Sequence, residues 1–317
     1  MAIEGGFENL HGFNPSDVTI IIPTLNAAPH ADAQIAALSR QGFPPESYLI
    51  VDSSSTDGSP ALFAARGMEV VTIAKSEFNH GGTRRFAVEH RPEAKFIIMM
   101  TQDAIPWHDR SLVNILDGFA DDMVGLSYGR QLPRSAARGI ERHARLINYP
   151  AESEVRNMAD SKHLGIKITF CSDSFAAYRR SALEAVGNFP RDCYFAEDQI
   201  VAGHMLANGW KIAYQADAAV VHSHGYTIIE DFRRYFDVGV FHARNAWLLD
   251  TYGTAEGEGV RFIRSELSYL LKHDIRQVPS ALIRTPAKYL AYRLGKLEAR
   301  LSKKTKRRLS MQPFYWK

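Results

Sequence analysis

The chain has 317 residues, of which 45% are hydrophobic and 23% are charged, and its formal net charge is +3. This composition is that of a globular protein with a full hydrophobic core, so it excludes disordered and fibrous classes. Residues 1–14 lack the pattern of a signal peptide, no stretch reaches the roughly 18 apolar residues of a membrane-spanning helix, and two cysteines, Cys171 and Cys193, are too few for a disulfide framework. We therefore expect a cytoplasmic protein with free thiols and no transmembrane anchor.

Four apolar runs rich in β-branched residues predict strands in the first third of the chain. They are Val18–Ile22, Tyr48–Val51, Glu69–Ile73 and Phe96–Met100, and helix-length segments separate them. This alternation predicts an α/β fold with a parallel sheet. In such sheets ligands bind outside the carboxyl ends of the strands, and three of the four runs lead directly into polar residues.

The first two strands are followed by polar turns. Pro23-Thr24-Leu25-Asn26 follows the first run, and the turn from Asp52 to Asp57 follows the second. A carboxylate in the second turn can accept a hydrogen bond from the imide N–H of uracil or thymine, and the hydroxyls beside it can reach a ribose. Asp and Ser are also common in ordinary turns and helix caps, so a turn of this kind, taken alone, more often has a structural role.

A glycine turn between Lys75 and Arg85 carries cations to the start of a helix. Its backbone N–H groups, together with Arg84, suit phosphate or base carbonyl oxygens. Gln102-Asp103 then follows the fourth strand, which places a carboxylate beside the expected nucleotide. Mg²⁺ and Mn²⁺ prefer oxygen ligands and commonly combine one or two carboxylates with substrate phosphates, although a single aspartate after a strand is often only a cap.

The following segment is less regular. A helix is expected around Arg110–Phe119 and a strand at Met123–Tyr128, whereas residues 130–167 are charged and predict a helix followed by a mobile loop that could close over a substrate. Regular elements return at Ser174–Tyr178, Ser181–Val186, Glu197–Asn208, Lys211–Tyr214 and Ala218–His222.

Two further motifs carry ionisable groups. Glu197-Asp198 opens a predicted helix, where the helix dipole alone favours acidic residues, but a carboxylate there can also act as a general base for an acceptor hydroxyl. His222-Ser223-His224 ends a predicted strand. We predict that these two imidazoles, at i and i+2, point to opposite faces of the strand. One of them would then meet a metal or a diphosphate while the other packs elsewhere. A catalytic zinc site needs a third ligand at suitable spacing, and none is evident.

The C-terminal part of the chain differs in charge from the rest. Between Arg261 and Lys317, fifteen Lys and Arg stand against three acidic residues, whereas residues 1–260 have a net charge of −9. Leucines and tyrosines recur there at roughly helical spacing, so we predict a catalytic domain over residues 1–252 and a basic amphipathic helical extension over residues 253–317. Such an extension suits an anionic membrane surface, packing on the catalytic domain, or a homodimer contact. No nucleic-acid-binding module surrounds the charge, so no nucleic-acid partner is expected.

Taken together, the motifs resemble those of family 2 glycosyltransferases with the GT-A fold, over roughly Val18 to Gly239. This resemblance implies a Rossmann-like, mostly parallel central sheet flanked by helices. It rests on the opening motif Pro23-Thr24-Leu25-Asn26, the base-binding Asp52, the glycine-arginine segment from Asn79 to Ala87, the metal-binding Gln102-Asp103-Ala104 and the catalytic Glu197-Asp198-Gln199. The segments Glu77–Arg84, Thr101–Ala104, and His222–His224 with Arg233–Gly239 resemble bacterial rhamnosyltransferases that build O-antigen or other cell-surface polysaccharides.

The resemblance implies inverting transfer of L-rhamnose from dTDP-L-rhamnose to a polyprenyl-diphosphate-linked saccharide, at the inner face of the plasma membrane. Asp198 would be the base, and Asp103 would hold Mg²⁺ or Mn²⁺. Many relatives carry Asp-x-Asp where this chain has Gln102-Asp103, so we expect either modest metal affinity or a shell completed by His222 or His224. The implied nucleotide-sugar site comprises Pro23, Thr24, Asn26, Asp52, Ser54, Asp57, His80, Gly81, Arg84, Gln102, Asp103 and Glu197.

Other functions stay open at this point. The same fold could use a UDP-hexose donor. A sugar nucleotidyltransferase should carry a glycine-rich loop near its N-terminus, which residues 20–40 lack. A non-catalytic saccharide-binding protein is disfavoured because Asp52, Asp103 and Asp198 are all present, although a fold alone does not decide function.

Overall fold

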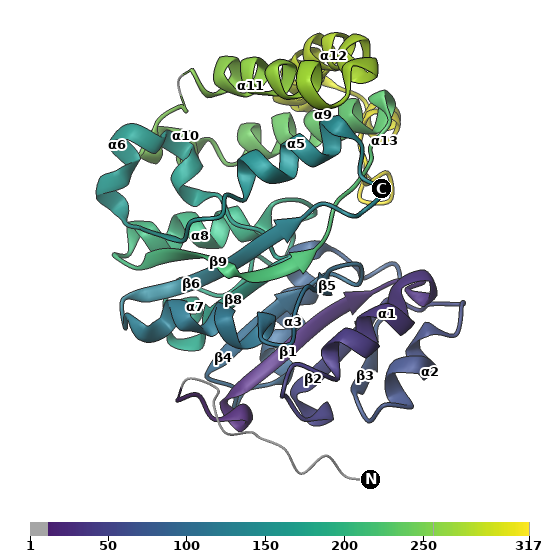
Figure 1. Ribbon diagram of the computed structural model, residues 1–317, viewed down its shortest axis with the longest axis vertical. Helices are drawn as coiled ribbons and strands as arrows, with labels where there is room; N and C mark the ends of the chain where they lie inside the picture. Colours follow the sequence, from purple (N-terminus) through teal and green to yellow (C-terminus); the bar gives the residue numbers. More distant parts are fainter. Residues whose placement is uncertain (1–11, 256, 317) are drawn as a thin grey trace.

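The computed structural model describes residues 12–255 and 257–316, and within these residues nine strands form one sheet (Figure 1). The strands lie in the spatial order β3-β2-β1-β4-β8-β6-β9-β5, and β7 pairs with β9 beside this path. Their bounds are β1 Val18–Thr24, β2 Tyr48–Asp52, β3 Glu69–Thr72, β4 Phe96–Met100, β5 Ile105–Pro106, β6 Val124–Leu132, β7 Glu154–Arg156, β8 Phe175–Arg179 and β9 Lys211–Val221.

The direction of strand pairing changes across the sheet. β1 to β4 pair in parallel, as expected, and the predicted α/β fold is confirmed. β8 lies antiparallel between β4 and β6, while β5 and β7 are antiparallel to β9, so the sheet is mixed beyond β4. The reversal of β8 brings its first residue to the carboxyl end of β4, where Phe175 pairs with Met100.

Helices cover both faces of the sheet. Ile20 and Ile22 of β1 pack into the core beneath α1, α2 and α4, whereas Ile21 packs into the core beneath α3, α7 and α8. Because successive strand residues point to opposite faces and both faces are covered, these strands are continuous apolar runs, which is why they are visible in the sequence. The helices are α1 Ala28–Leu38, α2 Ser59–Ala64, α3 His80–His90, α4 Ser111–Asn114, α7 Arg180–Ala185 and α8 Glu197–Ala207.

Residues 130–167 are more regular than expected. They contain the end of β6, helix α5 (Gly139–Asn148), strand β7 and helix α6 (Ser161–Leu164), so the prediction of a mobile loop after one helix is wrong. The buried Arg156 holds this segment in place, since it donates hydrogen bonds to the backbone oxygens of Lys167 and Phe170 and to the hydroxyl of Tyr128. A buried guanidinium with three acceptors is a fixed anchor rather than part of a lid.

Two other predicted elements differ in extent. The strands expected at Lys211–Tyr214 and Ala218–His222 are one strand, β9, whose register shifts opposite Gly129 and Arg130. The helix expected around Arg110–Phe119 is the short α4 followed by a 3₁₀ helix, Ile115–Ala120. Neither difference moves a candidate site residue.

The basic C-terminal extension is helical, as expected, and it packs on the rest of the molecule through α9 (Figure 1). Helices α9 and α12 approach closely at Gly239 and Gly295: a Cβ atom on Gly239 would lie 2.2 Å from the Tyr292 oxygen, and one on Gly295 would lie 2.1 Å from the Phe236 oxygen. The helices of this region are α9 Ile228–Arg244, α10 Ala246–Tyr252, α11 Glu258–His273, α12 Val278–Lys296 and α13 Lys303–Leu309.

An aromatic cluster joins the extension to the loop before α8. The ring of Tyr194 stacks on Tyr315 with centroids 4.2 Å apart and meets Trp316 edge-on at 5.5 Å. Phe236 and Val240 of α9 complete this small core. The division into residues 1–252 and 253–317 remains a prediction. None of the described helices is both long and apolar enough to span a bilayer.

Candidate active site

The polar motifs meet at the edge of the sheet formed by the carboxyl ends of β1, β2 and β4. Thr24, the last residue of β1, lies in register with Asp52, the last residue of β2, and its hydroxyl donates to the Asp52 carboxylate at 3.1 Å. The backbone N–H of Ser55 donates to the other carboxylate oxygen at 2.8 Å. Asp52 is therefore buried and orders the turn after β2, and its predicted contact with a nucleotide base stays a prediction.

The other residues of the two turns hold the loops to one another. Asn26, at φ 51°, accepts from the N–H of Thr56 at 3.0 Å. Asp57 accepts from the N–H of Ala28 at 2.8 Å and from Ser59, and these hydrogen bonds lower the pKa of Asp57. The hydroxyl of Ser54 donates to the Ile73 oxygen, and Pro23 lies opposite Val51. These side chains shape one side of the sheet edge where a nucleoside is expected.

Gln102 directly precedes Asp103 after the end of β4. Its Oε1 atom accepts from the N–H of Leu25 at 2.7 Å, and its Nε2 atom donates to the Leu25 oxygen at 3.2 Å. A carboxylate could make only the first of these two contacts, because it is an acceptor alone when ionised. Gln102 thus joins the ends of β4 and β1 and leaves Asp103 as the carboxylate at this point.

Asp103, His222 and His224 form one cluster, with their ligand atoms within 4.8 Å of one another. The Nε2 atoms of His222 and His224 lie 3.4 and 3.6 Å from the Asp103 carboxylate and 3.1 Å from each other. The prediction that the imidazoles point to opposite faces is therefore wrong. Its premise fails, because side chains two residues apart in an extended chain lie on the same face, and both rings follow directly after the end of β9 at Val221.

The chemistry of this cluster fits a divalent metal. Burial lowers the pKa of His222 and that of His224, the latter to about 4, so both rings are neutral donors at neutral pH. Gln131 Oε1 lies 2.9 Å from His222 Nδ1 and also accepts from Arg145, which places the ring proton on Nδ1 and leaves Nε2 free to bind a metal. Two ring nitrogens and one carboxylate oxygen suit Mn²⁺ better than Mg²⁺, which prefers oxygen ligands alone.

Asp103 is ionised within this cluster. Burial opposes its ionisation, but the contacts with His222 and His224 outweigh that effect and hold its pKa below the usual range. The guanidinium of Arg134 also lies 3.1 Å from the carboxylate. Arg134 lies in the charged stretch of residues 130–167, which gave no sign of a role for it, and the structure places it beside the candidate site.

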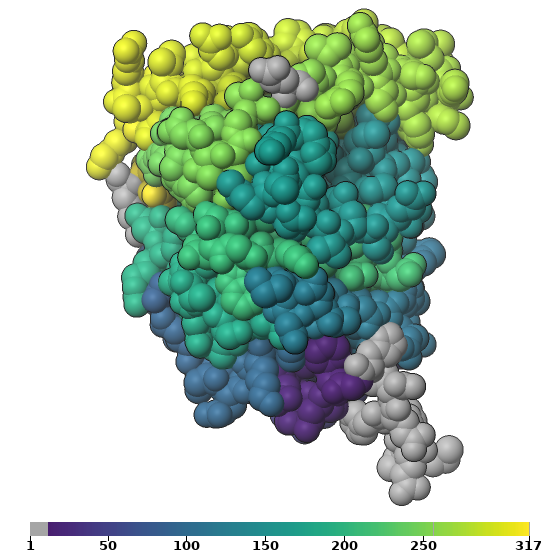
Figure 2. All heavy atoms as spheres, turned by 90° about the vertical axis from the view of Figure 1, so that its left-hand side faces the viewer, coloured from purple at the N-terminus to yellow at the C-terminus, as the bar shows by residue number. Residues whose placement is uncertain are grey.

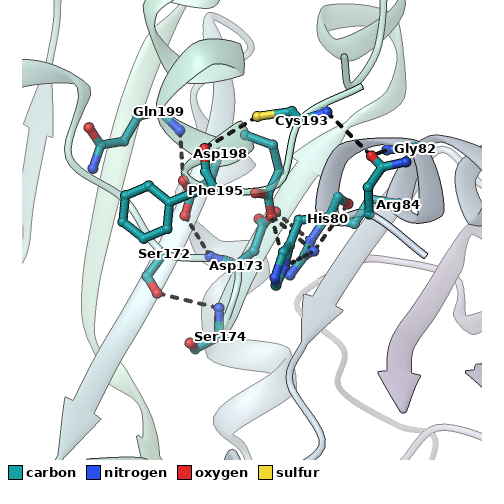
Figure 3. A network of polar contacts seen from close by, with 12 residues as sticks. His80, Gly82, Arg84, Ser172, Asp173, Ser174, Cys193, Phe195, Asp198 and Gln199 are labelled. Carbon is teal, nitrogen blue, oxygen red and sulfur yellow. Dashed lines mark hydrogen bonds and ion pairs between the residues drawn. The ribbon is translucent and has the colours of Figure 1, made fainter. Parts of the chain in front are cut away.

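Asp198 lies at the first turn of α8, one residue after Glu197. Its carboxylate accepts hydrogen bonds from the backbone N–H groups of Asp173 at 3.2 Å and of Gln199 at 2.8 Å (Figure 3). Burial and the neighbouring Glu197 carboxylate raise the pKa of Asp198 to about 6. This value is close to the range in which a carboxylate accepts a proton efficiently near neutral pH.

Arg84 is the centre of a buried ionic network behind Asp198. Its Nε atom lies 2.7 Å from the Asp173 carboxylate, and its Nη1 atom lies 2.9 Å from Glu197, with all three side chains at most 5% exposed. Figure 3 shows Arg84 and Asp173 of this network close together beside Asp198. His80 lies beside them, 4.0 Å from Glu197, and its pKa is lowered to about 3 by burial and by the Arg84 charge.

The glycine turn packs inside the protein. The N–H of Gly81 donates to the Cys193 oxygen at 2.8 Å, and the N–H of Gly82 donates to Asn79 at 2.7 Å. A Cβ atom on Gly81 would lie 2.2 Å from the Pro190 oxygen, so only glycine fits there. The groups that we expected to face phosphate are thus paired within the protein, and direct contact of His80, Gly81 and Arg84 with a donor stays a prediction.

Asp173 was missed by the sequence reasoning. It is buried, accepts a hydrogen bond from the Tyr178 hydroxyl at 2.6 Å and belongs to the network around Arg84. It precedes β8, and an acidic residue at the amino end of a predicted strand carries no local signal of a site in a parallel sheet. Because β8 is antiparallel to β4, its amino end lies at the same edge as those carboxyl ends.

Comparison with known proteins agrees with this geometry. Residues 19–187 match the model of the family described as glycosyl transferase family 2. The chain is 44% identical over 299 residues to the O-antigen chain rhamnosyltransferase WbaN of Salmonella anatum, covering 94% of this chain and 95% of that protein. It is 42% identical over 300 residues to the O-antigen chain rhamnosyltransferase RfbN of Salmonella typhimurium, covering 94% and 96%.

The fold is also shared with solved structures. The mannosyltransferase PcManGT from Pyrobaculum calidifontis, solved in complex with GDP-Man and Mn²⁺, superposes with a TM-score of 0.59 at 20% identity, over 89% of this chain and 86% of that one. S. aureus TarS superposes with a TM-score of 0.54 at 17% identity, over 92% of this chain and 52% of that one. These likenesses confirm the GT-A fold, and the family model and the sequence relatives establish that the chain belongs to glycosyl transferase family 2.

Proposed function

We propose that this glycosyltransferase transfers L-rhamnose from dTDP-L-rhamnose, with inversion, to a hydroxyl group of a lipid-linked saccharide during synthesis of a cell-surface polysaccharide. The observation that carries this proposal is the identity of 44% and 42%, over almost the whole chain, with two proteins described as O-antigen chain rhamnosyltransferases. The carboxylate of Asp198, the cluster around Asp103 and the turn after β2 supply groups suited to each part of that reaction.

In the proposed reaction Asp198 takes the proton from the acceptor hydroxyl. The acceptor oxygen attacks the anomeric carbon of the sugar from the face opposite the nucleotide, a new C–O bond forms, and the bond to the diphosphate oxygen breaks to release dTDP. General-base catalysis of this kind is worth about 10²- to 10⁴-fold in rate. The two N–H groups that bind the Asp198 carboxylate orient it for that proton transfer.

Asp103, His222 and His224 would hold a divalent metal, and the donor set favours Mn²⁺. Such an ion, when bound, stabilises negative charge on a departing diphosphate. The Mn²⁺ in the structure of PcManGT supports this assignment. Gln131 and Arg145 position His222 for the same purpose.

The nucleoside would lie along the turns after β1 and β2. Thr24, Asn26, Asp52, Ser54 and Asp57 all belong to these turns, and Asp52 is the group proposed to meet the base. The acceptor would be a polyprenyl-diphosphate-linked saccharide at the inner face of the plasma membrane. The O-antigen chains in the names of both relatives support this acceptor class.

Release of nucleoside diphosphate from a panel of donors tests the proposal. The purified protein with Mn²⁺ is given dTDP-rhamnose, UDP-glucose, UDP-N-acetylglucosamine and UDP-galactose, with Asp103→Asn as the matched control for metal-dependent release. Selective release of dTDP, lost in the control variant, is expected. Selective release of UDP would overturn the rhamnose donor and favour a UDP-hexose, while leaving the family assignment in place.

A further inference from the structure

Helices α11 and α12 present an apolar face to solvent. We define the outer face of α11–α12 by six large side chains, each between 55% and 65% exposed: Leu271, Ile275, Leu282, Ile283, Tyr289 and Leu290. On α12 these residues recur at a spacing of seven, which places them on one side of a helix. Ala281, Ala291 and Gly295 lie on the opposite side, buried against the molecule.

The charges around this face have one sign. All three acidic residues between Arg261 and Lys317 are turned inward. Glu266 is buried, Asp274 accepts from the N–H of Gly139, and Glu298 pairs with Arg244 and Lys306. Basic side chains remain exposed on these helices and on the segments that follow each of them: Lys272 on α11, Arg293 and Lys296 on α12, Arg276 and Arg300 in the 3₁₀ turns after α11 and α12, and Lys303, Lys304, Arg307 and Arg308 on α13. The outward surface of the extension is thus apolar and cationic.

We propose that the outer face of α11–α12 docks on the surface of an anionic lipid bilayer. An amphipathic helix with apolar residues amid lysines and arginines buries its apolar side at the lipid headgroup level, while its cations meet anionic lipids. A second copy of this chain is a poorer partner, because a symmetric contact would place the same cationic face against itself. Figure 2 shows the extension gathered at one end of the molecule, opposite the N-terminal strands, so the face is free to meet a flat surface.

Docking on this face would also orient the active site, and this step rests on the proposed function. The guanidinium of Arg284, on the inner side of α12, pairs with Asp231 and donates to the backbone oxygen of Tyr226 at 2.7 Å. The ring of Tyr226 stacks on His224 of the metal cluster, with centroids 5.3 Å apart. A protein docked through α12 would therefore hold the segment that carries His224 at a constant position relative to the bilayer from which a lipid-linked acceptor extends.

Co-sedimentation of the whole protein with vesicles tests the docking. We expect binding to phosphatidylcholine vesicles that contain phosphatidylglycerol, and weaker binding to phosphatidylcholine alone or at about 1 M salt, where charges are screened within a few ångströms. The double substitution Leu282→Glu with Leu290→Glu should lower the partition coefficient by at least about tenfold, because both exposed side chains lose their apolar contact. Substitutions are preferred to deletion, since deletion would uncover the core around Phe236.

A matched control keeps the result specific. Met123→Glu with Val155→Glu alters two exposed apolar residues away from the extension by the same charge, and it should bind vesicles like the unaltered protein. Equal binding by both double variants would overturn the proposal, as would failure of the unaltered protein to bind anionic vesicles. If Leu282→Glu with Leu290→Glu changed the molecular mass of the protein in sedimentation, without a change in vesicle binding, the face would be assigned to contact with a second copy instead. Donor hydrolysis without vesicles should be unchanged in both variants, so failure of the proposed donor is seen separately.

Discussion

Asp198 combines a raised pKa with a carboxylate held by two backbone N–H groups. Asp198→Asn removes the base without changing the size of the side chain, so we expect the rate of transfer to fall by about 10²- to 10⁴-fold while dTDP binding, measured by calorimetry, persists. In the unaltered enzyme the protonated form predominates below about pH 6, so activity should be present above that pH and lost as pH falls through it. Full activity of Asp198→Asn would exclude Asp198 as the base.

The charge of Arg84 lowers the pKa of Asp198, the proposed base. Its positive charge favours the ionised form of Asp198, so Arg84→Gln should move the acidic limb of the pH–rate profile upward by about one pH unit or more. Arg84→Lys keeps the charge and should leave the limb near its original position. Loss of a buried ion pair also costs about 3–5 kcal/mol, so thermal unfolding is followed in both variants. Identical pH profiles for the two variants would assign Arg84 a purely structural role.

Gln131 acts on the metal cluster through His222. Gln131→Leu introduces an apolar side chain of similar size and removes the acceptor that holds the proton on His222 Nδ1. Residues that hydrogen-bond to a metal ligand typically contribute about 10- to 100-fold to metal affinity. We therefore expect Mn²⁺ binding, measured by titration calorimetry in the presence of dTDP, to weaken within that range. Unchanged affinity would mean that His222 is not a ligand or that its ring is held by other contacts.

The crossing of α9 and α12 depends on two glycines. Gly295→Leu would place side-chain atoms where the Phe236 oxygen lies, and we expect a loss of at least about 1–3 kcal/mol in the free energy of unfolding, measured with a chemical denaturant. Gly259→Ala is the matched control, because Gly259 is helical and has no atom near its Cβ position. That change should stabilise the protein by up to about 1 kcal/mol. If both variants lost stability equally, close packing at Gly295 would not be the cause.

The bounds of individual strands could be predicted from the sequence, whereas the pairing between strands could not. Strands β1, β2 and β4 were found to within two residues, because burial on both faces makes them continuous apolar runs. The direction of β8 depends on partners far away in the chain, so nothing local indicated that Asp173 would reach the active-site edge. The convergence of His222 and His224, by contrast, could have been predicted locally, because side chains two residues apart in an extended chain lie on the same face.

The extension illustrates the same difference. Its helical character follows from apolar residues at helical spacing, but composition alone did not show which side of each helix packs inward. The structure settles this for α12, where Ala281, Ala291 and Gly295 permit close approach to α9 and the larger apolar residues remain outside. Small residues on an amphipathic helix, rather than large ones, marked the packed side.

At the scale of the whole molecule, the catalytic region and the extension depend on each other. A chain ending at Tyr252 would expose Phe236 and Val240 of α9, which are now covered by α12 and Trp316. We expect such a fragment to aggregate when it is expressed, as judged by size-exclusion chromatography, whereas the full chain elutes as a discrete species. A soluble, folded fragment with undiminished donor hydrolysis would show that residues 1–252 form an independent domain.

The contact of Tyr194 with Tyr315 and Trp316 joins residues that are far apart in the sequence, so it can form only late during synthesis of the chain. A ribosome releases β1 to β4 early, and their local βαβ connections allow that part to fold first. The loop that leads into Glu197 and Asp198 gains its aromatic support only when residues 315–316 have emerged. A nascent chain in which β1 to β4 have already folded would therefore still lack these contacts beside the segment that leads to Asp198, the proposed base.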